Sequence, residues 1–177
     1  MGLQPTLKLL SLPVYHLDGF LGIDLLKHLA IELNLQKGTI TFSREPLSIR
    51  AKALSAPLQL QEIEQQIGEQ KGLRTVPIVE GFISGRGPFH FFIDTGTSAP
   101  ALVGEEIWQS LGLGEDKEAT LEGVQLGEIT LEKVPAAKGS GAEFWRNVIL
   151  LGNNIFLTNG YKRLALDFLA GKLYAER

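Results

Sequence analysis

One sequence pattern occurs twice in this chain of 177 residues, at 21–42 and again at 151–174. Each copy begins with Leu-Gly, continues into a short apolar stretch, and then alternates apolar and polar residues with a period of two. Each alternating run ends near a glycine, Gly38 or Gly171, and a second short run follows. Alternating runs joined at a glycine predict a β-hairpin, because glycine readily adopts the positive φ of a tight turn. We therefore expect two related hairpins, each preceded by a short helix.

The alignment of the copies places Asn34 on Asp167 and Gly38 on Gly171, and the second copy carries three extra residues before its turn. Only the second copy is preceded by the run FHFFIDTGTS, at 89–98. The order is therefore a closing half, a connector, a front half and another closing half. We expect a complete unit over 74–177. We expect 1–44 to be the closing half of a preceding unit whose front half lies outside this sequence.

The connector, residues 45–73, is rich in Ser, Ala, Gln and Glu and contains Pro46 and Pro57. This composition predicts a solvated linker. The alternative is a short amphipathic helix over 58–67, where apolar residues occur at helical spacing between Pro57 and Gly68.

The complete unit has the pattern of a mostly β domain. Its alternation and turn residues predict strands at 75–83, 88–93 and 101–103, a helix at 105–111, further strands within 119–134, and a buried strand at 148–151. The aromatic residues of 88–93 predict a strand that is buried on both faces. Many short strands with frequent turn glycines are typical of β architectures.

A single carboxylate, Asp94, ends the aromatic strand. Burying a carboxylate costs several kcal/mol unless hydrogen bonds or a chemical role compensate for it. The next residues supply that compensation: Thr95 and Ser98 carry hydroxyls, and Gly96 lets backbone N–H groups approach closely. The segment therefore predicts a carboxylate that is held ionised or shares a proton, as in an aspartic peptidase half-site.

Composition excludes several other functions. The chain has no cysteine, so disulfides, thiol catalysis and thiolate metal sites are excluded. Its net charge of −3 argues against nucleic acid and anionic membranes as partners. It contains no apolar run long enough to span a bilayer. The three histidines, His16, His28 and His90, lack the spacing of metal ligands, and we expect no metal.

Three segments resemble the retropepsin-like aspartic peptidases. FFIDTGTSAPALV resembles the active-site segment of that family, and VILLGNNIF resembles its second signature, an apolar strand that ends in glycine before a short helix. HLDGFLGIDLLKHLAIELNLQKGTITF resembles the closing segment of bacterial members with two such units. The resemblance covers 74–177 and, as a half-copy, 12–43.

The resemblance implies a closed β barrel with short helices and an aspartic endopeptidase that cleaves extended peptides with a carboxylate-activated water. Asp94 would supply one of two carboxylates at the floor of a cleft. Thr95 would brace the turn and Gly96 would leave room for substrate, while Thr97, Ser98 and Ala99 would line the cleft floor. No cofactor is implied.

The mechanism of that family needs two such turns, and this chain has one. Asp24 and Asp18 lack the Thr/Ser-Gly sequel, so neither is the mate. Three alternatives are open: a homodimer pairs two copies of Asp94, a missing front half supplies the mate, or the fold has lost its chemistry. In the last case Asp94 is a turn residue and the protein is a peptide-binding or dimerisation module.

Further expectations concern the two tryptophans, a flap and the location of the protein. Trp108 and Trp145 are expected in the core. A flap over the cleft is expected between Gly112 and Gly127, with a polar tip at 115–117. A periplasmic or secreted location, with a signal segment outside this sequence, and a cytoplasmic location are both open.

Overall fold

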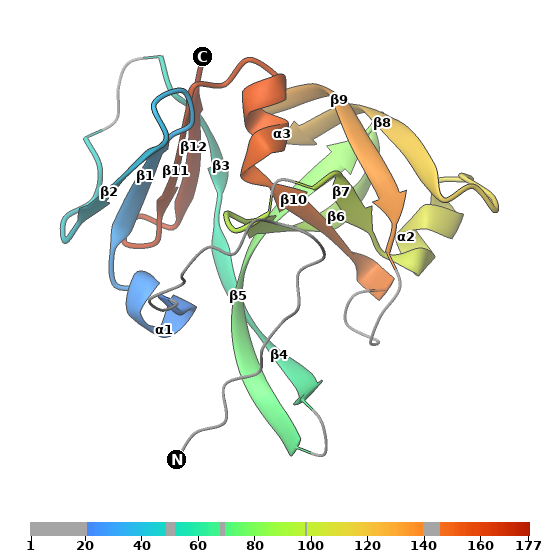
Figure 1. Ribbon diagram of the computed structural model, residues 1–177, viewed down its shortest axis with the longest axis horizontal. Helices are drawn as coiled ribbons and strands as arrows, with labels where there is room; N and C mark the ends of the chain where they lie inside the picture. Colours follow the sequence, from blue (N-terminus) through green and yellow to red (C-terminus); the bar gives the residue numbers. More distant parts are fainter. Residues whose placement is uncertain (1–20, 49–51, 68–69, 98, 140–145) are drawn as a thin grey trace, which may run out of the picture.

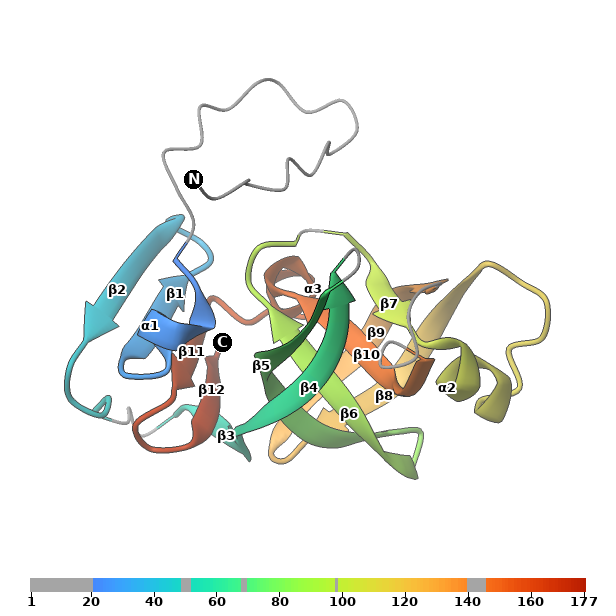
Figure 2. The same cartoon turned by 90° about the horizontal axis from the view of Figure 1, so that it is seen from below.

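A computed structural model describes residues 21–48, 52–67, 70–97, 99–139 and 146–177 (Figure 1). The protein is mostly β, with two sheets that lie side by side (Figure 2). The smaller sheet has the strand order β2-β1-β11-β12-β3 and the larger has the order β4-β5-β6-β10-β7-β9-β8. The smaller sheet contains β1 (Ala30–Asn34), β2 (Thr39–Ser43), β3 (Leu54–Pro57), β11 (Arg163–Asp167) and β12 (Lys172–Glu176). The larger contains β4 (Gln59–Ile67), β5 (Gln70–Ile83), β6 (Arg86–Asp94), β7 (Ala101–Val103), β8 (Glu118–Leu126), β9 (Ile129–Lys138) and β10 (Val148–Gly152).

Three short helices accompany the sheets: α1 (Ile23–Leu26), α2 (Glu105–Ser110) and α3 (Asn153–Thr158). The expected helix at 105–111 and the two helical stretches after Leu-Gly are therefore confirmed. Gly112 has a φ of 76° just after α2, as expected of a residue that terminates a helix.

The two repeats form the hairpins β1–β2 and β11–β12, with the same internal register. Leu33 pairs with Ile40 in the first hairpin, and their counterparts Leu166 and Leu173 pair in the second. The turn glycines, Gly38 and Gly171, have φ values of 64° and 63°. The expected pair of related hairpins is thus confirmed.

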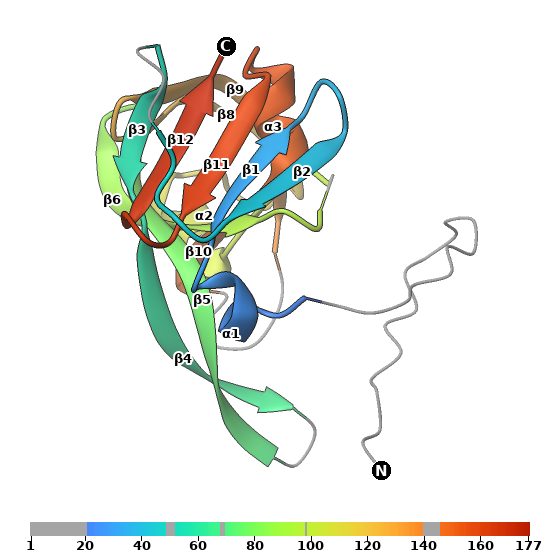
Figure 3. The ribbon, with the colours of Figure 1, turned by 90° about the vertical axis from the view of Figure 1, so that its left-hand side faces the viewer.

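The hairpins pair with each other through β1 and β11, and this pairing has two-fold symmetry. Ala30 pairs with Asp167 and Asn34 pairs with Arg163. Exchanging each residue for its counterpart in the other repeat turns one of these pairs into the other. A pseudo-two-fold axis therefore passes between β1 and β11, and Figure 3 shows the sheet face-on with these strands at its centre.

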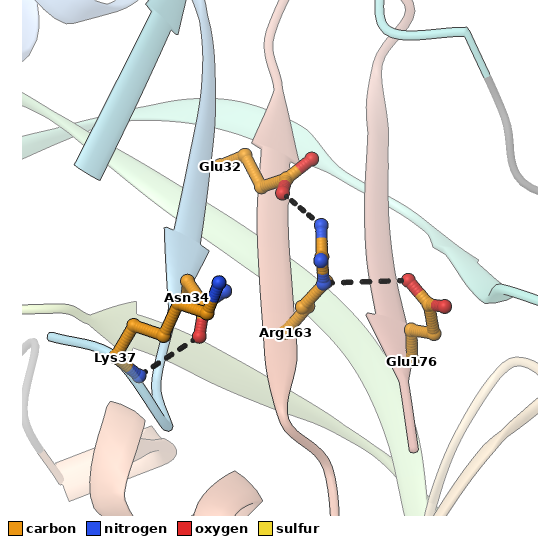
Figure 4. Close-up of polar contacts among 5 residues, drawn as sticks. All are labelled: Glu32, Asn34, Lys37, Arg163 and Glu176. Atoms are coloured by element: carbon orange, nitrogen blue, oxygen red, sulfur yellow. Dashed lines mark hydrogen bonds and ion pairs between the residues drawn. The ribbon is translucent and has the colours of Figure 1, made fainter. Parts of the chain in front are cut away.

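The smaller sheet has one polar and one apolar face. Glu32, Arg163 and Glu176 lie on the polar face (Figure 4), where an Arg163 guanidinium nitrogen is 2.9 Å from Glu32 Oε1 and another is 3.8 Å from Glu176 Oε2. The opposite face packs on the larger sheet, and its buried members include Leu33, Leu164, Leu166, Leu173 and Ala175. Because strand side chains alternate between faces, the period of two in the repeats creates this division.

The larger sheet curls into a partial ring. The end strand β8 pairs with β5, the second strand from the other end, through Phe82 with Gln125 and Ile83 with Val124. The mostly β class is confirmed, while the closed barrel implied by the resemblance stays a prediction. The core lies inside the ring and extends to the apolar face of the smaller sheet, and its fully buried members include Phe91, Trp108, Phe156 and Tyr161. The core position expected for Trp108 is confirmed, and Trp145 lies outside the described residues.

β3 connects the two sheets. The backbone N–H and the hydroxyl of Ser55 both donate to Glu128 Oε2, each at 3.0 Å, at the turn between β8 and β9. These two bonds, the backbone one first, lower the pKa of the exposed Glu128 carboxyl. In return, Glu128 N donates to Ser55 O at 2.9 Å. The edge strand of one sheet is thereby fixed to a turn of the other.

The expectations for the connector and for one strand are wrong. Residues 54–57 and 59–67 form strands β3 and β4, which pair with β12 and β5, so this part of the connector is neither a solvated linker nor a helix. Strands β4 and β5 extend together as an arm away from the sheets (Figures 1 and 3). The strand that leads to Asp94 is also not buried on both faces, since Phe91 and Ile93 are buried whereas Phe92 and His90 are half-buried. His90 lies 3.7 Å from Glu80 on the adjacent strand.

Asp167 and Asn34 occupy equivalent positions in the two hairpins, but we expect their replacement by alanine to cost different amounts of stability. Asp167 is fully buried, and its oxygens accept hydrogen bonds from Leu47 N at 2.7 Å and Ala170 N at 2.9 Å. Its counterpart Asn34 is half-buried and accepts one hydrogen bond, from Lys37 N at 2.9 Å (Figure 4). We expect Asp167→Ala to lower the free energy of unfolding by about 3 kcal/mol and Asn34→Ala by about 1 kcal/mol. Urea denaturation measures both, and equal losses would contradict this account.

Candidate active site

Asp94 lies at the end of a strand, β6, that runs parallel to its neighbour β10. It is the last residue of β6, and its partner in the register is Gly152, the last residue of β10. The carboxylate is half-buried at this strand end. The register therefore fixes the backbone at Asp94 against β10.

The turn that follows holds the carboxylate in place. Gly96 N donates to Asp94 Oδ1 at 2.9 Å. A Cβ at position 96 would lie 3.2 Å from that same oxygen, so a side chain there would crowd the carboxylate. This is the hydrogen bonding and the close backbone approach that the sequence predicted for Gly96.

The end of β10 and the start of α3 hold the same turn from its other side. Asn153 Nδ2 donates to Thr95 O at 2.9 Å. A Cβ on Gly152 would lie 2.4 Å from Thr97 O, so the backbone of this turn packs directly on the glycine. Gly152 therefore packs against the backbone of the carboxylate turn, and Asn153 is hydrogen-bonded to it.

The other residues predicted for the site surround this turn. Thr95, Gly96 and Ala99 are exposed, Thr97 is half-buried, and Ser98 lies outside the described residues. Thr97 Oγ1 accepts a hydrogen bond from Ala99 N at 3.2 Å, so its hydroxyl is used within the turn. Thr95 alone among them lines a cavity of about 280 Å³, which also contacts Leu33, Ile40 and Leu157. This cavity lies between the Asp94 turn and the first hairpin.

Sequence reasoning did not single out Asn153 as part of the site. It noted the polar residues after Leu-Gly only as a feature of the repeat. The contact of Asn153 with Thr95 joins residues far apart in the sequence, and no local pattern indicates it. In the first copy the half-buried Ile23 stands at the place of Asn153, and the exposed Asp24 stands at the place of Asn154.

Within the part of the chain that the structure describes, no Lys, Arg or His forms an ion pair with Asp94. The described residues also contain no cluster of acidic or histidine side chains able to hold a metal ion. None of the helices in the described ranges is both long and apolar enough to cross a bilayer.

Neither a family model nor a curated protein matches this sequence.

Proposed function

We propose that this chain is part of a retropepsin-like aspartic endopeptidase and that Asp94 is one of its two catalytic carboxylates. The observation that carries the proposal is the held turn at Asp94, with its Gly96 hydrogen bond and its seat on Gly152. Rigid support of this kind is what a catalytic group needs, because small errors of position are costly to rate.

The chemistry follows from pairing this carboxylate with a second one. Two carboxylates in contact share one proton, because both cannot readily be ionised at that distance. The ionised member takes a proton from a bound water, and the water oxygen attacks the peptide carbonyl carbon. The neutral member donates its proton to the carbonyl oxygen. The carboxyl that was protonated by the water then gives that proton to the amine nitrogen as the C–N bond of the tetrahedral intermediate breaks. The other carboxylate takes a proton back from a hydroxyl of the intermediate, which becomes the carboxylic acid.

The pseudo-two-fold axis supports this proposal, because it relates the Asp94 turn to a second position in the protein. This axis relates Gly152 to its counterpart Gly22, and it relates the Asp94 turn to the surface around Gly22. Thr97 occupies the space beside Gly152, whereas a Cβ added to Gly22 would meet nothing within 4 Å. We infer that a second Asp-Thr/Ser-Gly turn occupies this space in the complete enzyme.

A homodimer is a less favourable source of the second carboxylate. To bring two complete units together about a two-fold axis at β11, the second copy would have to pair with that strand. In this protein β1 already pairs with β11 over five residue pairs. The half-unit therefore holds the place that a second copy would need.

A chain with a second front half tests the proposal. Residues 52–139 are fused ahead of residue 1 to give an extended chain, in which 1–20 act as the linker. We expect the extended chain to hydrolyse an unstructured peptide at mildly acidic pH and the 177-residue chain to leave it intact. Mass spectrometry of the products measures both. Peptide binding without hydrolysis by the extended chain would instead support a binding module.

A further inference from the structure

The apolar face of the smaller sheet extends beyond the part that the larger sheet covers. Leu173 and Ala175 on β12 are 0% and 1% exposed, whereas their counterparts on β2, Ile40 and Phe42, are 57% and 47% exposed. These four positions share one face, because each pairs across its hairpin with a buried residue of the same face. The same sheet face is therefore core in one repeat and exposed in the other.

The helices of the two repeats show the same contrast. Counting from the shared Leu-Gly, Ile155 in α3 is 3% exposed and its counterpart Leu25 in α1 is 54% exposed. Leu151 is fully buried, while Leu21 is 60% exposed. Leu25 and Phe42 also line one cavity of about 580 Å³. We call these exposed residues (Leu21, Leu25, Ile40 and Phe42), together with the free edge of β2, the half-unit surface.

The edge of β2 has no strand beside it among the described residues. The corresponding edge of β12 is covered by β3, with Leu173 paired to Ala56. Beyond β3, Leu58 N donates to Gly171 O at 2.9 Å. The counterpart Gly38 has open space where a Cβ would be. Unpaired edges are commonly protected by Lys, Pro or a bulge, and β2, with the sequence TITFS, has none of these.

We propose that the half-unit surface docks a second front half-unit, a polypeptide segment built as residues 54–138 are. Its first strand adds to β2 in the register that β3 takes on β12, so that its counterpart of Ala56 pairs with Ile40. Its remaining strands cover Leu21, Leu25 and Phe42. The occupant is specified because every exposed apolar residue of this surface is the counterpart of a residue that the front half covers in the complete unit.

A second copy of this chain does not meet this description, because its own front half already closes on its own β11–β12 hairpin. The inference deepens the proposed function by naming the partner and the surface, and it rests on that function only in taking the partner to be a front half-unit. Its evidence is the burial and register of the repeats, which do not depend on catalysis.

Hydrogen exchange on the extended chain tests the docking directly. We expect the β2 amides to exchange at least about tenfold more slowly in the extended chain than in the 177-residue chain, since paired edges gain protection. The readout does not depend on catalysis. Protection without hydrolysis would support the docking and count against the proposed function, and hydrolysis without protection would do the reverse.

Disulfide formation between introduced cysteines tests the proposed register. No native cysteine competes for the bond. We expect Ile40→Cys to form a disulfide under mild oxidation with Ala56→Cys of the added segment. Thr41→Cys is the matched control, because position 41 faces the other side of the sheet, and it should not form the bond. Equal crosslinking at both positions, or β2 protection that appears in a dimer of the 177-residue chain, would overturn the proposal.

Discussion

Asp94→Asn in the extended chain is expected to reduce peptide hydrolysis by at least about a thousandfold while leaving the fold unchanged. Asparagine keeps the shape of the side chain, and its oxygen can still accept the hydrogen bond from Gly96 N, which is 2.9 Å from Oδ1. It cannot accept a proton from water at the pH of the assay. The turn should therefore persist while its chemistry is lost. Initial rates on a fluorogenic peptide, with circular dichroism of both proteins, measure the two effects.

Glu122→Gln is the control for this change. Glu122 is an exposed carboxylate on β8, and its backbone oxygen accepts a hydrogen bond from Ser84 just before β6, at the opposite end of that strand from Asp94. We expect it to leave the rate within about twofold of the parent, because exposed surface substitutions away from a site have small effects. A loss shared by both variants would indicate a general effect of charge and not a catalytic role for Asp94.

Gly152→Ala is expected to lower the free energy of unfolding by about 3 kcal/mol and to displace the carboxylate turn. The added methyl group would lie 2.4 Å from Thr97 O and 2.9 Å from Thr97 Cγ2, and a backbone oxygen cannot move without the turn that carries it. Since Gly152 pairs with Asp94, the strain falls on the proposed catalytic group itself. Chemical denaturation measures the stability loss, and hydrolysis by the extended chain measures the displacement.

Gly22→Ala separates the packing effect from any general cost of replacing glycine. Gly22 is the counterpart of Gly152, and nothing lies within 4 Å of the position of its missing Cβ. In the 177-residue chain we expect a change of less than about 0.5 kcal/mol. In the extended chain the same substitution should become harmful, because the second turn would then pack on this residue. Similar effects in both chains would argue against the packing of a second turn on Gly22.

The sequence predicted those elements whose signals are local. The two hairpins followed from alternation and the turn glycines, and α2 followed from the acidic residues at its start and Gly112 at its end. The segment 59–67 was mispredicted because Leu60, Ile63 and Ile67 fit a helical spacing, while the fold depends on pairing with β5. Such pairing is a tertiary effect that overrides local propensity.

The candidate site divides in the same way. The Asp94 turn with its Gly96 hydrogen bond was predictable, because all its atoms come from neighbouring residues. The seat on Gly152 and the tie from Asn153 join segments that are far apart along the chain, so only the structure reveals them. The exposed face of β2 was also hidden, because alternation indicates which side chains share a face and not what covers them.

The most direct measurement compares the hydrolysis rates of three variants of the extended chain, with Asp94→Asn in the original segment, in the added segment, or in both. Groups that act as a unit are not additive, so a shared pair predicts that each single variant loses as much activity as the double variant. The account of two carboxylates that share one water would be contradicted if the substitution in the added segment left the rate unchanged.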